Sequence, residues 1–433
     1  MVSPPDLALA QPLSVDILLT IFVLITAVIF LWSLYNLSIF AAGVRRYFRI
    51  HDKRVDSEPQ SRSPFISLIV PAKNEEKVIG RVLDSLLDLR YPKDRMEVFV
   101  VEDGSTDNTK GIALRYASEH PNLIRCIHNA TSEGKPAALN LALQQARGNI
   151  VGVLDADNVP DSRLLVHVAK SFDDNATVAV QGITESINAQ ANMLTKVVSL
   201  EEAAWFKTVL NGKDHLRLFV PLTGSCQFIR SNVLRELGGW DKSSLAEDVE
   251  LAARLLANGH RVRFCEQAVT SQEAPSRLSQ LFRQRSRWYR GYIETAIKYG
   301  SLLTNPNGLR VDAEVTLFGP ILLGMSFANY WLSWAVLTWT TTFVARILAY
   351  LMVGLTSALL LALGLGLVYL VRPRRISNFL WLPFIYAYWF LQTVIATYAL
   401  SLMVLRRPRI WAKTEKTGSV DSRHETNTTP IGE

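Results

Sequence analysis

The stretch VGVLDADNVP, residues 151–160, joins a short apolar run to two closely spaced carboxylates. The run over 150–154 has the length and composition of a buried strand, and Pro160 cannot continue a strand ladder. Asp155 and Asp157, two residues apart at a strand end, can point the same way. Carboxylates that close repel unless a cation lies between them, and a hard divalent cation that also holds substrate phosphates is the natural partner. The stretch therefore predicts a strand that ends in a metal site, with a solvated loop as the alternative.

The composition indicates a membrane protein with a folded domain. The chain has 433 residues, of which 49% are hydrophobic, so it is long enough for several domains and apolar enough for membrane spans. Its net charge is +7, and many basic residues flank apolar segments, which favours a membrane surface over nucleic acid. Cys126, Cys226 and Cys265 lack metal-ligand spacing, and their odd number argues against a disulfide framework.

The first apolar stretch covers residues 15–43 and is long enough to span a bilayer. A secretory signal peptide would have a basic start and a shorter apolar region. No Lys or Arg precedes this stretch, whereas Arg45, Arg46 and Arg49 follow it. The positive-inside rule therefore predicts that the N-terminus is outside and that the chain from residue 45 onward is in the cytosol.

Three further apolar stretches, rich in Trp and Tyr, cover 314–345, 347–371 and 378–405. Basic clusters follow the second and the third: Arg372, Arg374 and Arg375, then Arg406, Arg407 and Arg409. If the chain from residue 45 onward is in the cytosol, three further crossings would put the C-terminus outside. Both basic clusters, however, favour the cytosolic side. Either one stretch is interfacial or re-entrant, or the first contains two short spans.

The region from residue 65 alternates strand and helix patterns. Strands are expected at 66–70, 98–101, 124–128, 150–154, 178–180 and 262–264, and helices at 75–87, 108–119, 135–146, 162–172, 192–210, 247–258 and 276–300. This alternation predicts an α/β domain with a mainly parallel sheet. Ligands of such sheets bind at the C-terminal strand ends, here the loops 71–76, 102–106 and 155–160.

These patterns predict seven segments. They are an N-terminal tail (1–14), a transmembrane helix (15–43), a basic linker (44–64), the α/β domain (65–275), interfacial amphipathic helices (276–313), about three transmembrane helices (314–405) and a basic, then disordered tail (406–433).

Charged residues at strand and helix ends are candidate ligand contacts. Glu102 and Asp103 end the second strand and could accept hydrogen bonds from a nucleobase or a ribose, or could cap the next helix. Lys135 opens a helix, where a cation is unfavourable unless an anion is bound, so it is a candidate phosphate contact or a solvated surface lysine.

Two later motifs suggest a base and an anion-binding helix. Asp248, in Ala-Glu-Asp at the start of the 247–258 helix, could take a proton from an attacking hydroxyl, or could only complement the helix dipole. In Gln284-Arg-Ser-Arg-Trp288, arginine could pair with diphosphate oxygens and the indole could pack on a sugar ring. The alternative is an aromatic-basic helix anchored in the membrane interface.

The chain contains the motifs EDGS, DAD, AED and QRSRW in this order, and VPAKNEE and GKPAALN lie among them. This set of motifs resembles the membrane-integrated family 2 glycosyltransferases of the cellulose, chitin and hyaluronan synthase type, including poly-N-acetylglucosamine synthases. The resemblance implies a GT-A catalytic domain (a Rossmann-like mixed sheet), a nucleotide-diphosphate sugar and Mg²⁺ or Mn²⁺.

The resemblance also implies roles for individual residues. Asp248 would be the catalytic base, and Asp157 with Asp155 would hold the metal. The nucleotide sugar would be bound by Glu75, Glu102, Asp103, Lys135, Asp155 and Asp157. The acceptor and the diphosphate would be bound by Glu247, Gln284, Arg287 and Trp288. Glu102 and Ala246 depart from the commoner Asp and Thr at those positions.

The implied activity is inverting transfer from UDP-N-acetylglucosamine or UDP-glucose to form a β linkage, first of all on a growing polysaccharide. The rival in the same class is a single transfer to a lipid, as in ceramide glucosyltransferases. A nicotinamide dehydrogenase would need Gly-x-Gly-x-x-Gly after the first strand, where PAKNEE stands, and a non-catalytic transporter or scaffold would keep charges inside its spans.

We expect an integral protein of the plasma membrane with a cytosolic catalytic domain, bound to membrane lipids but not to nucleic acid. Accessory subunits are not determined by the sequence.

Overall fold

The computed structural model describes residues 13–51, 63–339, 343–370, 376–409 and 416–418. The chain forms two compact units. The α/β unit contains residues 41–318 and the segment from 408 on, and the helical unit contains the chain up to residue 40 together with 319–407. Four expected features lie wholly or partly outside the described residues: residues 1–12 of the expected tail 1–14, the middle of the linker (52–62), the cluster Arg372–Arg375 and most of the tail after 409.

The α/β unit is built on an eight-stranded sheet. Its strands are β1 (Ile66–Ala72), β2 (Met96–Asp103), β3 (Ile124–Asn129), β4 (Ile150–Val153), β5 (Val159–Pro160), β6 (Ala179–Ser186), β7 (Gln227–Arg230) and β8 (Val262–Gln272). They lie in the order β3-β2-β1-β4-β7-β6-β8-β5. The first four strands of that order are parallel, whereas β7 runs antiparallel to both β4 and β6. The sheet is therefore mixed, and the expected GT-A-like fold class is confirmed.

The strand register places the motif loops at one edge. Ala72 at the end of β1 pairs with Glu102, and Asp103 pairs with Asn129. Val153, the last residue of β4, pairs with Ile69, so Asp155 leaves the sheet beside the end of β1. Parallel neighbours end on the same side, which is why residues far apart in the sequence meet there.

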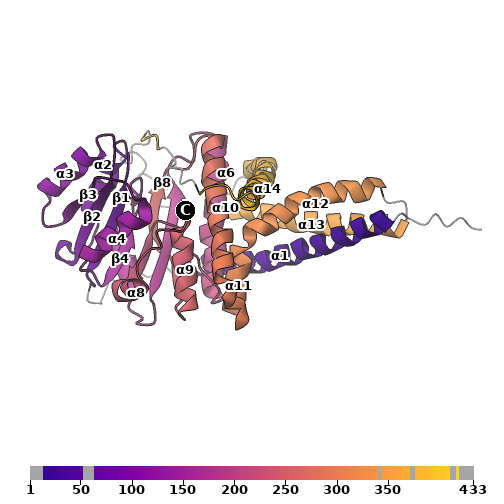
Figure 1. The fold of residues 1–433 in the computed structure, drawn as a ribbon, viewed down its shortest axis with the longest axis horizontal. Coiled ribbons are helices and arrows are strands. Elements are labelled where there is room, and N and C mark those ends of the chain that lie inside the picture. The colour runs from indigo at the N-terminus through magenta and orange to yellow at the C-terminus, as the bar shows by residue number, and fades with distance from the viewer. Residues whose placement is uncertain (1–12, 52–62, 340–342, 371–375, 410–415, 419–433) are drawn as a thin grey trace, which may run out of the picture. The chain divides into compact units, whose positions relative to one another are not determined.

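Helices cover both faces of this sheet (Figure 1). The helices of this unit are α2 (Ile79–Leu87), α3 (Thr109–Glu119), α4 (Lys135–Gln145), α5 (Leu164–Ser171), α6 (Met193–Ala204), α7 (Asn211–His215), α8 (Ser231–Glu236), α9 (Glu247–Ala257), α10 (Leu278–Tyr299) and α11 (Gly308–Leu317). Side chains alternate along a strand, so Leu68 packs into the core with α2, α3 and α5, and Ile69 into the core with α4, α8 and α9. Both residues are fully buried, and these two cores hold the strand ends in place.

Strand β8 is much longer than the expected 262–264. The register between β6 and β8 shifts between Gln181 and Ile183, and pairing then resumes from Val269 to Gln272. An irregularity of this kind interrupts the alternation of a strand, so the pattern appeared to end at Phe264. The continuation carries the chain to Glu273, which is a part of the candidate site described below.

The helical unit contains α12 (Gly319–Trp339), α13 (Phe343–Leu370), α14 (Leu382–Val404) and most of α1 (Leu13–His51). Among the described residues, four helical segments are long and apolar enough to cross a membrane: Ile17–Phe48, Gly319–Trp339, Arg346–Tyr369 and Ile376–Val404. Phe22 of α1 packs with Val336 of α12 and Ala349 of α13. In Figure 1 these three helices run across the view, whereas α14 is seen nearly end-on.

Candidate active site

Lys135 is the centre of the candidate site. As the first residue of α4, it donates hydrogen bonds to Oδ1 of Asp155 at 2.6 Å and to the carbonyl of Gly224 at 2.9 Å. Oε1 of Glu247 lies 3.6 Å away. Burial opposes the charge of this lysine, but the nearby Asp155 and Glu247 outweigh it and raise the pKa of Lys135 above its ordinary value. Lys135, expected to meet a phosphate, thus joins the Asp-x-Asp motif to the Ala-Glu-Asp motif.

Asp157 is buried and faces two elements that the motif analysis did not include. Its Oδ2 accepts a hydrogen bond from the backbone N–H of Glu273 at 3.2 Å. The same oxygen lies 2.7 Å from the ammonium group of Lys416. Burial works against that charge, but Asp157, Asp155 and Glu75 raise the pKa of Lys416. The charges of three expected site carboxylates therefore act on one cation.

The buried carboxylate of Glu273 holds the segment Lys416–Gly418. It accepts hydrogen bonds from the N–H of Thr417 at 2.7 Å and from the N–H of Gly418 at 3.0 Å. Arg81 contributes a further bond to it at 3.3 Å. This part of the tail was expected to be disordered, but in the structure it is ordered by these bonds.

Asp155 and Asp157 fit a divalent cation. Each carboxylate already faces a lysine ammonium group, so the site is arranged to hold positive charge. No cluster of three or more His, Cys, Asp and Glu side chains suited to a metal occurs among the residues that the structure describes. Two carboxylates are sufficient, because Mg²⁺ commonly takes one or two carboxylates together with substrate phosphates and water.

Asp103 orders the loop that precedes Lys135. Its carboxylate accepts hydrogen bonds from Asn129 Nδ2 at 2.8 Å, from the Ser132 hydroxyl at 2.5 Å and from the N–H groups of Glu133 and Gly134 at 3.3 and 3.1 Å. A carboxylate with this many donors is held in one orientation. Asp103 therefore positions the start of α4, and its expected contact with a uracil or ribose stays a prediction.

Glu102 is fully buried beside Asp103. Its carboxylate accepts a hydrogen bond from the N–H of Ser105 and lies 2.5 Å from Nδ1 of His128. Burial would raise the pKa of Glu102, but the bonds from Ser105 and His128 outweigh it and lower the pKa. This internal pairing gives Glu102 a structural use, and its direct contact with a nucleotide stays a prediction.

Asp248 has the environment of a general base. Burial and the neighbouring Glu247 raise its pKa to about 7, against the opposing effects of Lys135 and Arg287. A base whose pKa lies near the working pH is the most effective one. Gly224 has φ +81°, and a Cβ atom there would lie 3.1 Å from Oδ2 of Asp248. The glycine thus lets a backbone carbonyl bind Lys135 without displacing Asp248.

Helix α10 brings its motif alongside Asp248. Arg287 donates to the carbonyl of Leu245 at 3.3 Å, and its charge lowers the pKa of Asp248. The helix approaches closely because a Cβ atom on Gly291 would lie only 2.6 Å from the Cβ atom of Ala246. The small residue at 246, noted above as a departure from Thr, is therefore part of this packing.

Gln284, Arg287 and Trp288 share a face of α10, since Arg287 and Trp288 lie three and four residues after Gln284. The ring of Trp288 is half-buried and lies against the guanidinium group of Arg285, with 4.5 Å to the ring centroid. Arg285 also donates to Oε2 of Glu201 at 2.6 Å. The indole is therefore held in place by α6 through an arginine.

Sequence reasoning missed Glu273, Lys416 and Gly224. Glu273 was hidden by the irregularity in β8, although a carboxylate directly before Ala-Pro at a strand end was a usable signal. Lys416 lies in a polar tail whose composition carries no structural signal. Gly224 becomes meaningful only through its contacts with Asp248 and Lys135.

Comparisons with known proteins agree with this architecture. Residues 63–291 match the family described as "Glycosyltransferase like family 2". The chain is 32% identical over 297 residues to a beta-monoglucosyldiacylglycerol synthase of Nostoc sp., covering 65% of this chain and 62% of the relative. It is 24% identical over 233 residues to a poly-beta-1,6-N-acetyl-D-glucosamine synthase of Staphylococcus epidermidis, covering 54% and 56%. The chain thus spans less than two thirds of either relative.

A solved structure shares the fold. It is the mannosyltransferase PcManGT from Pyrobaculum calidifontis in complex with GDP-Man and Mn²⁺, which has a TM-score of 0.55 and is 22% identical, covering 90% of this chain and all of that one. Since the family match covers more than half of the chain, the protein belongs to glycosyltransferase family 2.

Proposed function

We propose that the protein transfers a hexose from a UDP-sugar to a hydroxyl group of a membrane lipid, with inversion, to form a β-glycosidic bond. The observation that carries this proposal is the position of Asp248. This carboxylate has a pKa of about 7 and is adjacent to Glu247, whose side chain lies 3.6 Å from Lys135, the lysine paired with Asp155. A base and the predicted diphosphate site are thus joined through one lysine.

In the proposed reaction, Asp248 accepts the proton of the acceptor hydroxyl. The hydroxyl oxygen forms a bond to the anomeric carbon, and the bond from that carbon to the UDP oxygen breaks on the opposite face. Negative charge develops on the departing diphosphate, and the positive charges of Lys135 and Arg287 stabilise it. This role is supported by the effect of Arg287, whose charge lowers the pKa of Asp248.

Asp157 and Asp155 would hold Mg²⁺ or Mn²⁺, and when bound the ion would supply Lewis-acid stabilisation of the diphosphate. Because Lys416 lies on Asp157 in this structure, we propose that this lysine leaves when the ion and the donor bind.

The proposed lipid acceptor is supported by the sequence identity of this chain to two relatives. The relative named for monoglucosyldiacylglycerol synthesis is 32% identical, whereas the relative named for poly-N-acetylglucosamine synthesis is 24% identical. The second candidate function is therefore the polysaccharide synthesis that the motifs suggested first. UDP-glucose is the donor that we propose for a lipid product, and UDP-N-acetylglucosamine for a polymer.

We further propose that the α/β unit lies in the cytosol, with α1, α12 and α13 as the three crossings. The segment Lys416–Gly418 is hydrogen-bonded to Glu273, so it lies on the same side as the α/β unit. This requires that α14, seen end-on in Figure 1, lie in the interface instead of crossing. Both basic clusters that follow the apolar stretches are then cytosolic, as the positive-inside rule expects.

The test is to incubate the purified full-length protein with diacylglycerol and radiolabelled UDP-glucose, UDP-N-acetylglucosamine or GDP-mannose, with Mn²⁺ or EDTA. We expect one lipid-soluble product of a single sugar, formed only with a UDP-sugar and with metal, and resistant to an α-glucosidase but cleaved by a β-glucosidase. Water-soluble labelled chains would favour polymer synthesis instead. Transfer that persists in EDTA would contradict the metal site, and release of the sugar by the α-glucosidase would contradict inversion.

A further inference from the structure

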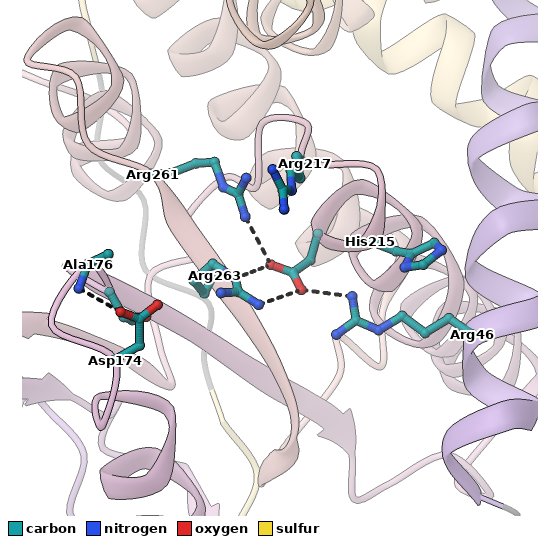
Figure 2. Close-up of a pocket in the computed structure, with 9 residues that line it drawn as sticks. Arg46, Asp174, Ala176, His215, Arg217, Arg261 and Arg263 are labelled. Atoms are coloured by element: carbon teal, nitrogen blue, oxygen red, sulfur yellow. Dashed lines mark hydrogen bonds and ion pairs between the residues drawn. The ribbon is translucent and has the colours of Figure 1, made fainter.

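A polar cavity of 550 Å³ lies in the α/β unit (Figure 2). It is lined by Arg46, Asp174, Ala176, Thr177, Asp214, His215, Arg217, Arg261 and Arg263. These residues come from the end of α1, the loop before β6, the α7 region and the start of β8. None of the described lining residues belongs to the candidate active site, so the cavity has to be explained separately.

The centre of the cavity is the carboxylate of Asp214, whose side chain is fully buried. Arg46 lies 2.8 Å from it, Arg263 2.7 Å and Arg261 4.0 Å. Burial would raise the pKa of Asp214, but the bonds from Arg263 and Arg46 outweigh it and lower the pKa. Figure 2 shows these three guanidinium groups converging on one carboxylate. One negative charge cannot neutralise three positive charges.

Arg217 adds a further positive charge at the same place. It is exposed, it has a left-handed backbone with φ +57°, and its guanidinium group forms no hydrogen bond or ion pair with any residue of the described ranges. A left-handed conformation is uncommon outside glycine, and it follows here from the end of the one-turn helix α7, where the N–H of Arg217 bonds the carbonyl of Asp214 at 3.1 Å. The turn thus places Arg217 where its side chain lines the cavity.

The remaining groups leave the cavity positively charged. Asp174 accepts the N–H of Ala176 at 2.9 Å and is turned toward its own loop. Burial lowers the pKa of Arg261, and repulsion from Arg263 and Arg217 adds to this effect although Asp214 opposes it. The lining holds four arginines against two aspartates, which is a surplus of two positive charges.

We propose that this cavity binds a phosphate ester. Arg217 and Arg261 would bind its oxygens, and Arg46 and Arg263 would be the other two positively charged groups around it. The planar guanidinium group of arginine pairs with two phosphate oxygens at once, and a phosphate ester supplies negative charge to balance the four arginines. The two sources of such a group are the headgroup of an anionic phospholipid and a soluble phosphate.

Two features of the chain favour the lipid headgroup. Arg46 lies near the end of Ile17–Phe48, the first membrane-span candidate, where basic residues meet lipid headgroups. Leu216, between His215 and Arg217, has 45% of its surface exposed. A leucine beside unpaired positive charge suits the boundary between headgroups and acyl chains.

The test uses the delipidated full-length protein. Binding of phosphatidylglycerol, phosphatidylcholine, glycerol 3-phosphate and inorganic phosphate is measured by titration, and bound lipids are counted by native mass spectrometry. The main variant is the double substitution Arg217→Gln/Arg261→Gln, chosen because neither arginine makes the short bonds to Asp214. The matched control is Arg115→Gln, whose side chain is 61% exposed on α3 and pairs only weakly with Glu119 at 4.0 Å.

We expect phosphatidylglycerol to bind more tightly than phosphatidylcholine, and the double variant to lose about tenfold or more in affinity, since it lacks two charge-assisted contacts with the phosphate. The control should bind as the parent does. The double variant should keep the melting temperature of the parent, which shows that lost binding is not lost folding. Tight binding of soluble phosphate that depends on the same arginines would support the site and identify the second source. Binding of every ligand that is unchanged in the double variant would overturn the proposal and leave the cluster as a brace for α1.

Discussion

The ammonium group of Lys416 lies 2.7 Å from Oδ2 of Asp157 and 2.8 Å from the backbone carbonyl of Glu273. The two ends of this ion pair are separated by more than half of the chain. Because Asp157 is the better candidate for the metal ligand, the lysine and a divalent cation would compete for one carboxylate.

The first prediction therefore concerns Lys416→Met. Removal of the ammonium group should let Mn²⁺ support UDP binding at a concentration lower by about tenfold, because a charge-assisted bond of roughly 1.5–3 kcal/mol no longer competes. Calorimetric titration of UDP at several Mn²⁺ concentrations measures this shift. Lys110→Met, at an exposed position on α3, is the matched control. A metal requirement that is the same in both variants would show that Lys416 does not block the metal site.

The second prediction is that Asp248→Asn abolishes transfer but keeps donor binding. An amide cannot accept the proton of the acceptor hydroxyl, so the rate should fall by about 10²–10⁴, the usual contribution of a general base. UDP should still bind, since Asp155, Asp157 and Lys135 are unchanged. Asp94→Asn, at an exposed position, serves as the control. Near-normal turnover in Asp248→Asn would remove this residue from the mechanism.

The third prediction follows from the raised pKa of Asp248. The base acts only when ionised, so turnover should rise with pH and level off above about 7. The folded pKa lies above the unfolded value of about 3.9, so the folded state binds more protons and the parent loses stability as the pH rises from about 4 to 7. The Asp248→Asn variant lacks this titrating group, so it does not lose stability in this way. Its melting temperature should exceed that of the parent by more at about pH 8 than at about pH 5. A difference that does not change with pH would mean that the pKa of Asp248 is not raised.

The fourth prediction tests the contact between α10 and α9. In Gly291→Ala the new Cβ atom would lie 2.6 Å from that of Ala246, so α10 must move and carry Arg287 with it. We expect a loss of turnover of up to about 10²-fold, as for a displacement of about 1 Å at a reacting site. Gly300→Ala is the control, because a Cβ atom there meets nothing within 4 Å. The double variant Gly291→Ala/Ala246→Gly should recover part of the activity. If it does not, the loss has a cause other than this contact.

The fifth prediction concerns Trp288. If the indole holds the acceptor, Trp288→Ala should reduce glycosyl transfer far more than hydrolysis of the UDP-sugar, and Trp288→Phe should retain part of the transfer. Aromatic packing of this kind is worth on the order of 1 kcal/mol, about fivefold in rate. Both products are measured in one assay. Equal loss of both would show that the indole, held by Arg285 at 4.5 Å, supports the fold or the donor site.

The sequence determined the class of the fold and the chemical groups of the site. Buried strands of uniform apolar character and amphipathic helices between them are local patterns, so the strands at 66–70, 98–101 and 150–154 could be recognised without a structure. Motif position likewise made Asp155, Asp157 and Asp248 candidates, because carboxylates at strand and helix ends carry a local signal, and the family resemblance added Glu247.

Only the tertiary structure decided which of these groups meet. The pairing of Lys135 with Asp155 and its approach to Glu247 join segments separated by up to 112 residues (247 − 135), and no local pattern encodes such a contact. Glu273 was concealed because an irregular strand breaks the alternation from which strands are recognised. Lys416 and the four arginines around Asp214 look like solvated charges in the sequence, since their meaning lies in the partners that folding brings to them. Secondary structure follows from neighbours in the chain, whereas the electrostatics of a site follows from neighbours in space.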